Sequence, residues 1–177
     1  ARETLGRGKS LMIMSVGALA DRELFAEVKR LAGENGARVY LPSGAIAGLD
    51  GLKSASMGGI RKITLTTTKN PRGLQGAPYI LEKKIDLSAL TGPTVIFQGS
   101  ALDAVKAFPA NVNVAASLFL AAGEGEVRVL VVADPDIHVN RHEIVVEGDF
   151  GRISTLVENV PSPRNPKTSY LAALSAI

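Results

Sequence analysis

The sequence contains no cysteine and no tryptophan, and only two histidines, His138 and His142, among its 177 residues. Without cysteine the chain has no disulfide framework, no thiolate nucleophile and no zinc–thiolate site. Two histidines are also too few for a metal centre built from several imidazoles. We therefore expect no metal, and a catalytic imidazole can come only from one of these two residues.

Blocks of like charge and long apolar runs are missing as well. The 20 Lys and Arg residues exceed the 17 Asp and Glu residues by a formal charge of +3, and the excess is spread along the chain. This pattern is typical of a solvated surface and does not indicate a nucleic-acid partner. No apolar stretch reaches the ~18 residues of a membrane span, and the apolar run 11–20 leads straight into a charged segment, unlike a signal peptide. We therefore expect a cytoplasmic protein that binds no membrane.

The first part of the chain predicts a strand–helix–strand unit. Residues 11–16 form a short apolar run closed by Gly17, which is typical of a strand buried on both faces. Asp21 can cap a helix of amphipathic spacing that ends at Gly36, and residues 37–46 read as a second strand. In such a unit ligands gather at the carboxyl ends of the parallel strands.

Small residues follow both of these predicted strands, in "SVGALAD" and in "PSGAIAG". One such turn is usually only a turn, but two on adjacent strands let a ligand approach the backbone closely and favour a ligand site. No Gly-x-Gly-x-x-Gly follows a strand, which argues against a complete dinucleotide fold. The stretch 6–10, "GRGKS", lacks the earlier glycine of a phosphate loop and predicts the end of a helix and a turn.

From residue 50 onward the pattern changes to that of a mixed sheet with helices. A capping box of Ser100 and Asp103 predicts a helix start, and the nearly all-apolar run 111–125 predicts a helix in a core or an interface. Asn165 suits the cap and Pro166 the first turn of a terminal helix. The predicted strands are 61–70, 94–101, 127–134, 142–150 and 151–160.

The predicted fold class is therefore α/β: a partial Rossmann-type βαβ unit followed by an α+β catalytic and dimerisation domain with a mixed sheet. We expect residues 1–48 to be the last part of a dinucleotide-binding domain and residues 49–160 to be the catalytic and dimerisation domain. Residues 161–177 are expected to return toward the nucleotide-binding domain as a loop and a helix.

His142 allows two interpretations from the sequence alone. It shares a strand face with Ile144 and Val146, so an imidazole at the edge of the core is the simpler one. The other is a general acid/base at the mouth of a pocket, for which an unperturbed pKa near 6.5 is well suited. Lys167 is also unusual, because a cation in the first turn of a helix opposes the helix dipole unless an anion is present or the side chain reaches outward.

Five blocks in this order resemble the L-aspartate dehydrogenase family: "SVGALAD", "LPSGAIAGLDGL", "GSALDAVKAFPANVNVAASLFLA", "VVADPDIHVNRHEIVVEGDFG" and "NPKTSYLAALS". The resemblance covers nearly the whole chain, as the last three-quarters or so of a family member. Such members open with a strand, a Gly-x-Gly-x-x-Gly turn and the first half of a nucleotide-binding domain, which have no counterpart in this sequence.

The resemblance implies NAD- or NADP-dependent oxidation of L-aspartate to iminoaspartate, which hydrolyses to oxaloacetate and ammonia or enters NAD biosynthesis. It also implies a homodimer joined through the catalytic domain. The catalytic histidine of the family falls on His142, the alanine beside the nicotinamide on Ala45 or its neighbour Ala47, and the cofactor-contacting asparagine on Asn113. We add Ser15 and Gly17 as cofactor contacts at the first strand end.

The two carboxylates of such a substrate need fixed donors. By chemistry alone we expect Asn165, Lys167 and Thr168 to form one anion pocket and Lys69 or Arg72 to supply a second clamp. Two alternatives stay open: a dimer-forming fragment of such an enzyme without catalytic activity, and a dehydrogenase of another small dicarboxylate.

Overall fold

The computed structural model describes residues 1–109, 113–123, 126–164 and 168–177. Helices, 3-10 helices (η) and strands follow one another as α1 (Arg2–Gly6), β1 (Leu11–Met12), η1 (Val16–Ala20), α2 (Arg22–Glu34), β2 (Val39–Tyr40), α3 (Leu49–Ser56), β3 (Ile60–Lys69), η2 (Pro71–Gly73), α4 (Pro78–Glu82), η3 (Leu87–Ala89), β4 (Thr94–Ser100), α5 (Ala101–Ala107), α6 (Asn113–Ala121), β5 (Val127–Ala133), β6 (Asn140–Gly148), β7 (Gly151–Asn159) and α7 (Tyr170–Leu174).

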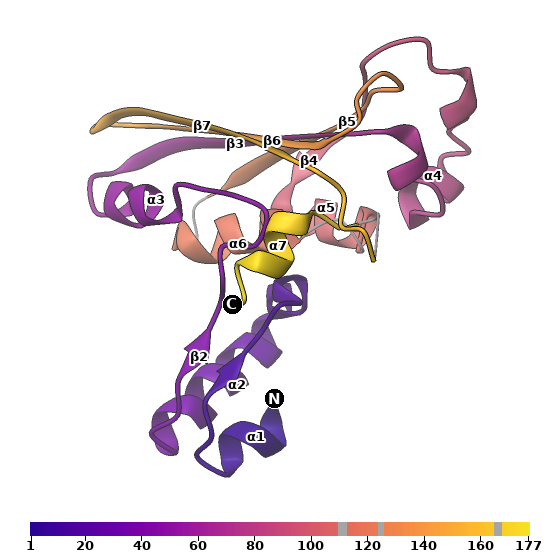
Figure 1. Cartoon of the computed structure of the whole chain (residues 1–177). Coiled ribbons are helices and arrows are strands. Elements are labelled where there is room, and N and C mark those ends of the chain that lie inside the picture. Colours follow the sequence, from indigo (N-terminus) through magenta and orange to yellow (C-terminus); the bar gives the residue numbers. More distant parts are fainter. Residues whose placement is uncertain (110–112, 124–125, 165–167) are drawn as a thin grey trace.

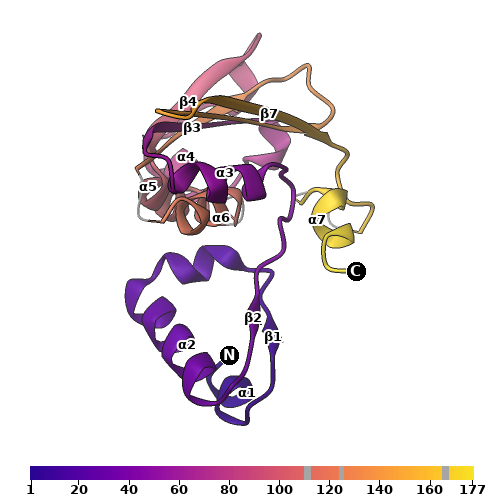
Figure 2. The same ribbon diagram turned by 90° about the vertical axis from the view of Figure 1, so that its left-hand side faces the viewer.

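These elements form two parts. The N-terminal unit contains α1, β1, α2 and β2, and the sheet unit contains the five strands β3 to β7 with helices beneath them (Figure 1). A 90° turn shows the two parts one above the other, joined by the chain after β2 (Figure 2). The 3-10 helix η1 packs against α6 and so forms the contact between them. The α/β fold with a βαβ unit and a mixed sheet is confirmed.

The N-terminal unit holds β1 parallel to β2, with Leu11 opposite Val39. The predicted strand 11–16 is shorter than expected, and it is not buried on both faces, since Met12 is 46% exposed. The reason is geometric: the two strands carry helix α2 on one side only (Figure 2), and the residues from Val16 onward turn into η1. The small residues at the strand end therefore belong to a 3-10 helix.

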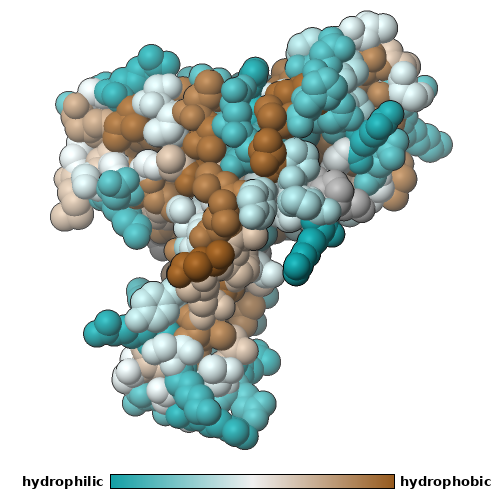
Figure 3. Space-filling model, viewed as in Figure 1, coloured by the Kyte–Doolittle hydropathy of each residue, from teal (hydrophilic) through white to brown (hydrophobic). Residues whose placement is uncertain are grey.

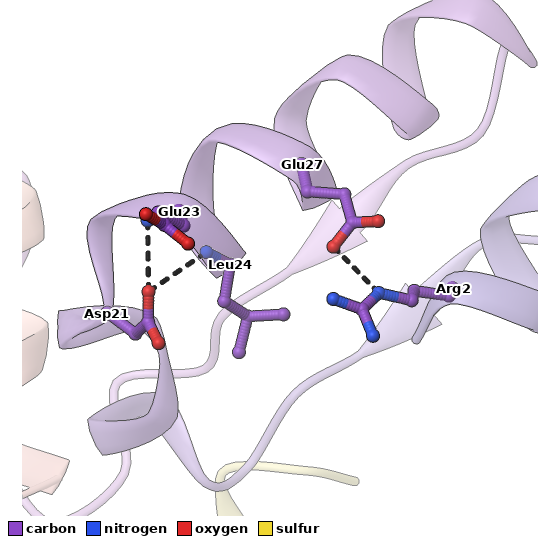
Figure 4. A network of polar contacts seen from close by, with 5 residues as sticks. All are labelled: Arg2, Asp21, Glu23, Leu24 and Glu27. Atoms are coloured by element: carbon purple, nitrogen blue, oxygen red, sulfur yellow. Dashed lines mark hydrogen bonds and ion pairs between the residues drawn. The ribbon is translucent and has the colours of Figure 1, made fainter.

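Helix α2 begins as the sequence predicts. The Asp21 carboxylate accepts hydrogen bonds from the backbone N–H groups of Glu23 and Leu24, at 2.9 and 3.1 Å (Figure 4). Such a cap satisfies N–H groups that have no partner within the helix and contributes about 1 kcal/mol. An ion pair between Arg2 and Glu27, 2.7 Å long, ties α1 to α2 on the surface.

The sheet unit is a five-stranded mixed sheet in the order β4-β5-β3-β6-β7. The central strand β3 runs parallel to β5 and antiparallel to β6. Alternation along β3 divides its side chains between two faces, and Ile63, Leu65, Thr67 and Lys69 share the buried one. That inner face lies against the helices, whereas in Figures 1 and 2 the opposite, outer face of the sheet carries no described helix.

The core of the sheet unit lies between the inner face and helices α5 and α6. Ser100 and Asp103 form the predicted capping box at the start of α5, and α6 buries several of its apolar residues as predicted. Phe97, Tyr79 and Phe108 form an aromatic cluster with ring centres 5.2 to 5.7 Å apart. Helices α3 and α4 were not predicted, because both are short and lie in Gly- and Pro-rich sequence.

The C-terminal helix starts later than the sequence predicts. Helix α7 begins at Tyr170, after Ser169, because Ser169 forms an antiparallel bridge with Pro161, flanked by backbone hydrogen bonds from Ser162 N–H to the Thr168 carbonyl and from Tyr170 N–H to the Val160 carbonyl. The predicted cap Asn165 and first-turn Pro166 lie outside the described residues. Apolar side chains gather at the narrow region between the two parts, over α7 (Figure 3). In the described part of the chain, no helix has the length and apolarity to cross a membrane.

Gly148, at the end of β6, tests how tightly the β6–β7 hairpin packs. A Cβ at this position would overlap the Gly59 carbonyl oxygen and the Phe150 ring. We expect Gly148→Ala to lower the free energy of unfolding by about 2 kcal/mol, as other overpacked sites do. Gly33→Ala in α2 is the matched control: a Cβ there meets nothing within 4 Å, so the helix gains about 0.5–1 kcal/mol. Denaturant unfolding of both variants would reveal the opposite signs, and equal effects would contradict this account.

Candidate functional site

A small pocket of about 60 Å³ opens where the N-terminal unit, the inner face of the sheet and the C-terminal segment meet. It brings together residues that are far apart in the sequence, from Met14 after β1 to Ala172 in α7. The residues that line it are Met14, Val16, Pro42, Ser43, Gly44, Ala45, Lys69, Asn113, Val114, Ser117, His142, Thr168, Ser169 and Ala172. Five of the predicted site residues are therefore in one place: Ala45, Lys69, Asn113, His142 and Thr168.

His142 lies on the inner face of β6, together with Ile144 and Val146 as predicted, and is 2% exposed. The register places it directly opposite Thr67 of β3. The Nδ1 atom of His142 lies 3.1 Å from the Thr67 hydroxyl, in a buried hydrogen bond. The imidazole is thus both a core residue and part of the pocket wall, and the two interpretations from the sequence do not exclude each other.

Lys69 ends β3 on the same face, two residues beyond Thr67, and is only 5% exposed. Burial disfavours its charged form and lowers its pKa from 10.5 to about 8. An ammonium that stays protonated at neutral pH inside a largely enclosed pocket is an attractive partner for an anion. Lys69 is thus the cation placed beside His142, as one of the two clamps expected from the sequence.

The pKa of His142 differs from the value near 6.5 that the sequence suggested. Burial of the ring lowers it, the positive charge of Lys69 lowers it further, and it falls to about 3. Without an anion in the pocket the imidazole is therefore neutral at pH 7. It can accept a proton, but it becomes an effective base only when a negative charge offsets burial and Lys69.

Ala45 and Ala47 take different positions. Ala45 is buried, faces the pocket and offers its backbone carbonyl to the Nδ2 group of Asn159, at 2.9 Å. Ala47 is exposed and does not face the pocket, although its carbonyl accepts a long bond of 3.5 Å from Thr155. Of the two alanines that the sequence left open, the geometry favours Ala45.

Asn113 joins the two parts of the molecule. It is the first residue of α6, and its Oδ1 atom accepts a hydrogen bond of 3.0 Å from the backbone N–H of Gly17 in η1. Gly17 is not among the residues that line the pocket, and it contacts Asn113 through its backbone N–H. Ser15 precedes η1 and does not face the pocket, whereas its neighbours Met14 and Val16 do.

The C-terminal segment contributes Thr168 and Ser169 to the lining of the pocket. Ser169 is held by the Nδ2 group of Asn140, which lies 3.4 Å from its hydroxyl. The predicted ligands Asn165 and Lys167 lie outside the described residues.

A larger cavity of about 820 Å³ lies beside this pocket, and Arg72 and His138 face it. The structure therefore does not bring Arg72 to His142, because Asn70 and Pro71 turn the chain away after β3. Between the two cations considered for the second clamp, only Lys69 reaches the pocket.

Three polar residues that bond to pocket-lining residues without lining the pocket themselves were missed in the sequence: Thr67, Asn140 and Asn159. A signal existed for Thr67, since strict alternation in "ITLTTTK" places it with Ile63, Leu65 and Lys69 on the apolar face. The sequence contains no such signal for Asn140 and Asn159, because an asparagine at the end of a strand is typical of a turn. In the structure both are buried, at 7% and 3% exposure, and they lie opposite each other across β6 and β7.

The site thus combines a neutral imidazole, a buried ammonium, hydroxyl groups and a backbone loop of small residues around one opening. This set can bind an anionic molecule and exchange a proton with it. Small residues at the carboxyl ends of β1 and β2 leave room for a second, flatter group against the backbone.

Comparison with known proteins found similar sequences and a similar solved structure. Residues 50–177 match the family model described as "Aspartate dehydrogenase, C-terminal". The chain is 57% identical over 176 residues to an L-aspartate dehydrogenase of Methanosarcina acetivorans, covering 99% of this chain and 65% of that protein. It is 56% identical over 175 residues to an L-aspartate dehydrogenase of Methanococcoides burtonii, again covering 65% of the relative.

A solved structure shows the same fold. The crystal structure of aspartate dehydrogenase from Thermotoga maritima superposes with a TM-score of 0.77 at 31% sequence identity. The match covers 97% of this chain and 66% of that one. The chain thus spans about 65% of the length of the curated relatives that it matches.

Lys69 makes a testable contribution to stability. The pKa of Lys69 is about 8 in the folded chain and 10.5 in the unfolded chain, so between these pH values the unfolded chain holds a proton on Lys69 that the folded chain has lost. Burial of the charged ammonium therefore destabilises the fold fully below pH 8, and this destabilisation decreases as the pH rises toward 10.5. We expect Lys69→Met to raise the free energy of unfolding by about 2 kcal/mol at pH 7, with a gain that shrinks toward pH 10.5. Lys62→Met, at an exposed position of the same strand, is the control and should change little. Denaturant unfolding at several pH values measures this, and a loss of stability at pH 7 would contradict it.

Proposed function

The chain belongs to the aspartate dehydrogenase family, and from this premise we propose that it forms the part of such an enzyme that binds the amino acid and transfers its protons. The reaction we propose is NAD- or NADP-dependent oxidation of L-aspartate to iminoaspartate, which yields oxaloacetate and ammonia or supplies NAD biosynthesis. The observation that carries the proposal is the meeting of His142 and Lys69 in one buried pocket beside Ala45.

His142 is the proton-transfer group in this proposal. Oxidation of an amino acid at C2 requires the amine to lose a proton, and hydrolysis of the imine requires a water to be deprotonated. One imidazole at the pocket wall can serve both steps, because it is neutral and its Nε2 atom carries none of the hydrogen bonds described for the residue. Burial keeps bulk water from competing for this nitrogen.

Lys69 and Thr168 are the proposed partners of the substrate carboxylates. The Lys69 ammonium supplies a charge-assisted bond, and the Thr168 hydroxyl, which also lines the pocket, supplies a neutral donor. A bound dicarboxylate also adds negative charge next to His142, which raises the pKa of the imidazole from its low ligand-free value toward neutrality. Substrate binding would thus turn a weak base into an effective one.

The nicotinamide end of the cofactor suits the wall formed by Ala45, Gly44 and the backbone near Gly17. These residues are small, and Gly44 adopts a φ of 65°, so a flat ring can approach the backbone closely. Asn113 stands at the same edge as a hydrogen-bonding side chain. The cofactor, when bound, supplies the acceptor for the hydride of C2. The glycine-rich turn that holds a pyrophosphate in Rossmann folds does not occur in this sequence.

We also propose that a second copy of the chain packs on the outer face of the sheet. Apolar side chains lie there among charged ones, and Leu156 and Val95 are 59% and 54% exposed. Val132 pairs with Val95 across β5 and β4 and extends this apolar surface. A homodimer through this face leaves the pocket on the inner face open.

Substitution of His142 tests the catalytic role. In a chain extended to the length of the curated relatives, we expect His142→Ala to lower kcat roughly 10²–10⁴-fold, the usual contribution of general acid/base catalysis. Cofactor binding should change little, because the imidazole acts on the amino acid. Steady-state kinetics with aspartate and a separate titration with NADH measure the two effects. Turnover near that of the unsubstituted enzyme would refute the role of His142.

Titration of the 177-residue chain with NADH decides whether the chain binds cofactor by itself. Cofactor affinity in Rossmann folds depends on backbone donors and the helix dipole at the pyrophosphate turn. We therefore expect fluorescence to show no binding at micromolar NADH, while light scattering shows a dimer. Micromolar binding would mean that the residues around Ala45 and Asn113 suffice, and would overturn the view of the chain as a non-catalytic fragment.

A further inference from the structure

Thr67 is the described residue that holds His142 by a hydrogen bond from outside the pocket. The two residues face each other across β3 and β6, both are at least 95% buried, and the hydroxyl lies 3.1 Å from Nδ1. Thr67 does not face the pocket. It borders a small void of about 10 Å³ in the core, next to Leu74 and Phe108. The Nδ1 edge of the ring is therefore bonded on the core side, while His142 as a residue lines the pocket.

The identity of the protonated nitrogen decides what the imidazole can do. A neutral ring carries one hydrogen, on either Nδ1 or Nε2, and the other nitrogen offers a lone pair. If Nδ1 donates to the threonine oxygen, Nε2 is left as an acceptor for a proton from a molecule in the pocket. If the hydroxyl donates to Nδ1, Nε2 carries the hydrogen and cannot act as a base.

We propose that Thr67 is a positioning residue for His142: its hydroxyl oxygen accepts the Nδ1–H and so keeps Nε2 unprotonated toward the pocket. The proposal rests on the proposed function, in which His142 takes a proton from the amino acid. A short β-branched side chain suits this task, because its few rotamers keep the oxygen in place and the register of β3 against β6 aligns it with the ring.

The positive charge of Lys69, which also lines the pocket, makes the tautomer of His142 important. With a cation nearby, the doubly protonated ring is disfavoured, so the imidazole stays neutral and the choice between its two tautomers matters throughout the neutral pH range. Among the described contacts of His142, the hydrogen bond at Nδ1 can determine which tautomer the ring adopts.

Nitrogen NMR of the chain labelled with ¹⁵N-histidine tests the tautomer directly and needs no activity. The sequence has only two histidines, so a His138→Gln variant assigns the signals. We expect His142 to carry its hydrogen on Nδ1 at pH 7. Thr67→Ser keeps the hydroxyl and should keep this tautomer, whereas Thr67→Val is nearly isosteric and should lose it. Thr66→Val, on the opposite face of β3, is the matched control and should leave His142 unchanged.

Two results would overturn the proposal: a hydrogen on Nε2 in the unsubstituted chain or in Thr67→Ser, or an unchanged Nδ1–H in a folded Thr67→Val. If the valine variant does not fold, the serine variant and the unsubstituted chain still decide it.

Kinetics separate this inference from the proposed function. In a chain extended to the relatives' length, Thr67→Val should lower kcat about 10-fold or more with little change in the KM for aspartate, a part of what a general base contributes. Thr67→Ser should restore most of it. An altered tautomer with unaltered kcat would support the hydrogen bond and overturn the base role of His142, so the two ideas fail independently.

Discussion

The burial of two basic side chains in one pocket is the constraint on which the rest of the site depends. Lys69 and His142 lie on the inner face of neighbouring strands, at 5% and 2% exposure, where burial of an apolar residue would cost less free energy. Burial lowers the pKa of both side chains, and the charge of Lys69 lowers the pKa of His142 further, so without a ligand the pocket holds one cation and one neutral imidazole. Such an arrangement lowers stability and is typical of a functional site rather than of a structural core.

Hydrogen bonds from buried or interfacial asparagines hold the walls of this pocket. Asn159 fixes the carbonyl of Ala45, Asn140 reaches Ser169, and Asn113 receives the N–H of Gly17. Each bond joins segments far apart in the chain, the longest spanning 114 residues. The two strand asparagines face each other across β6 and β7, so one point of the sheet holds both the small-residue loop and the C-terminal segment.

Much of the fold follows from local pattern, and the site follows from it only in part. Alternation and capping predicted β3 to β7, the start of α2 and the capping box of α5, because these depend on residues close in sequence. The short β1 and the late start of α7 escaped prediction, since tertiary contacts set them. For the site, residue chemistry and resemblance pointed to His142, Lys69 and Ala45. Asn159 could not be found, because only the folded register shows that it reaches a carbonyl 114 residues away.

The charge of the pocket also limits what can bind there. In the proposed function, an anion in the pocket interacts favourably with the Lys69 charge and raises the pKa of His142 at the same time. Binding and activation are thus the same electrostatic event. Because Lys69 is among the residues that line the pocket, the carboxylate of a compact anion can reach its ammonium group. In the proposed function, a small acid with its amine next to a carboxylate meets these charge requirements, and the hydrogen bond proposed between Thr67 and Nδ1 would leave Nε2 of His142 for the amine.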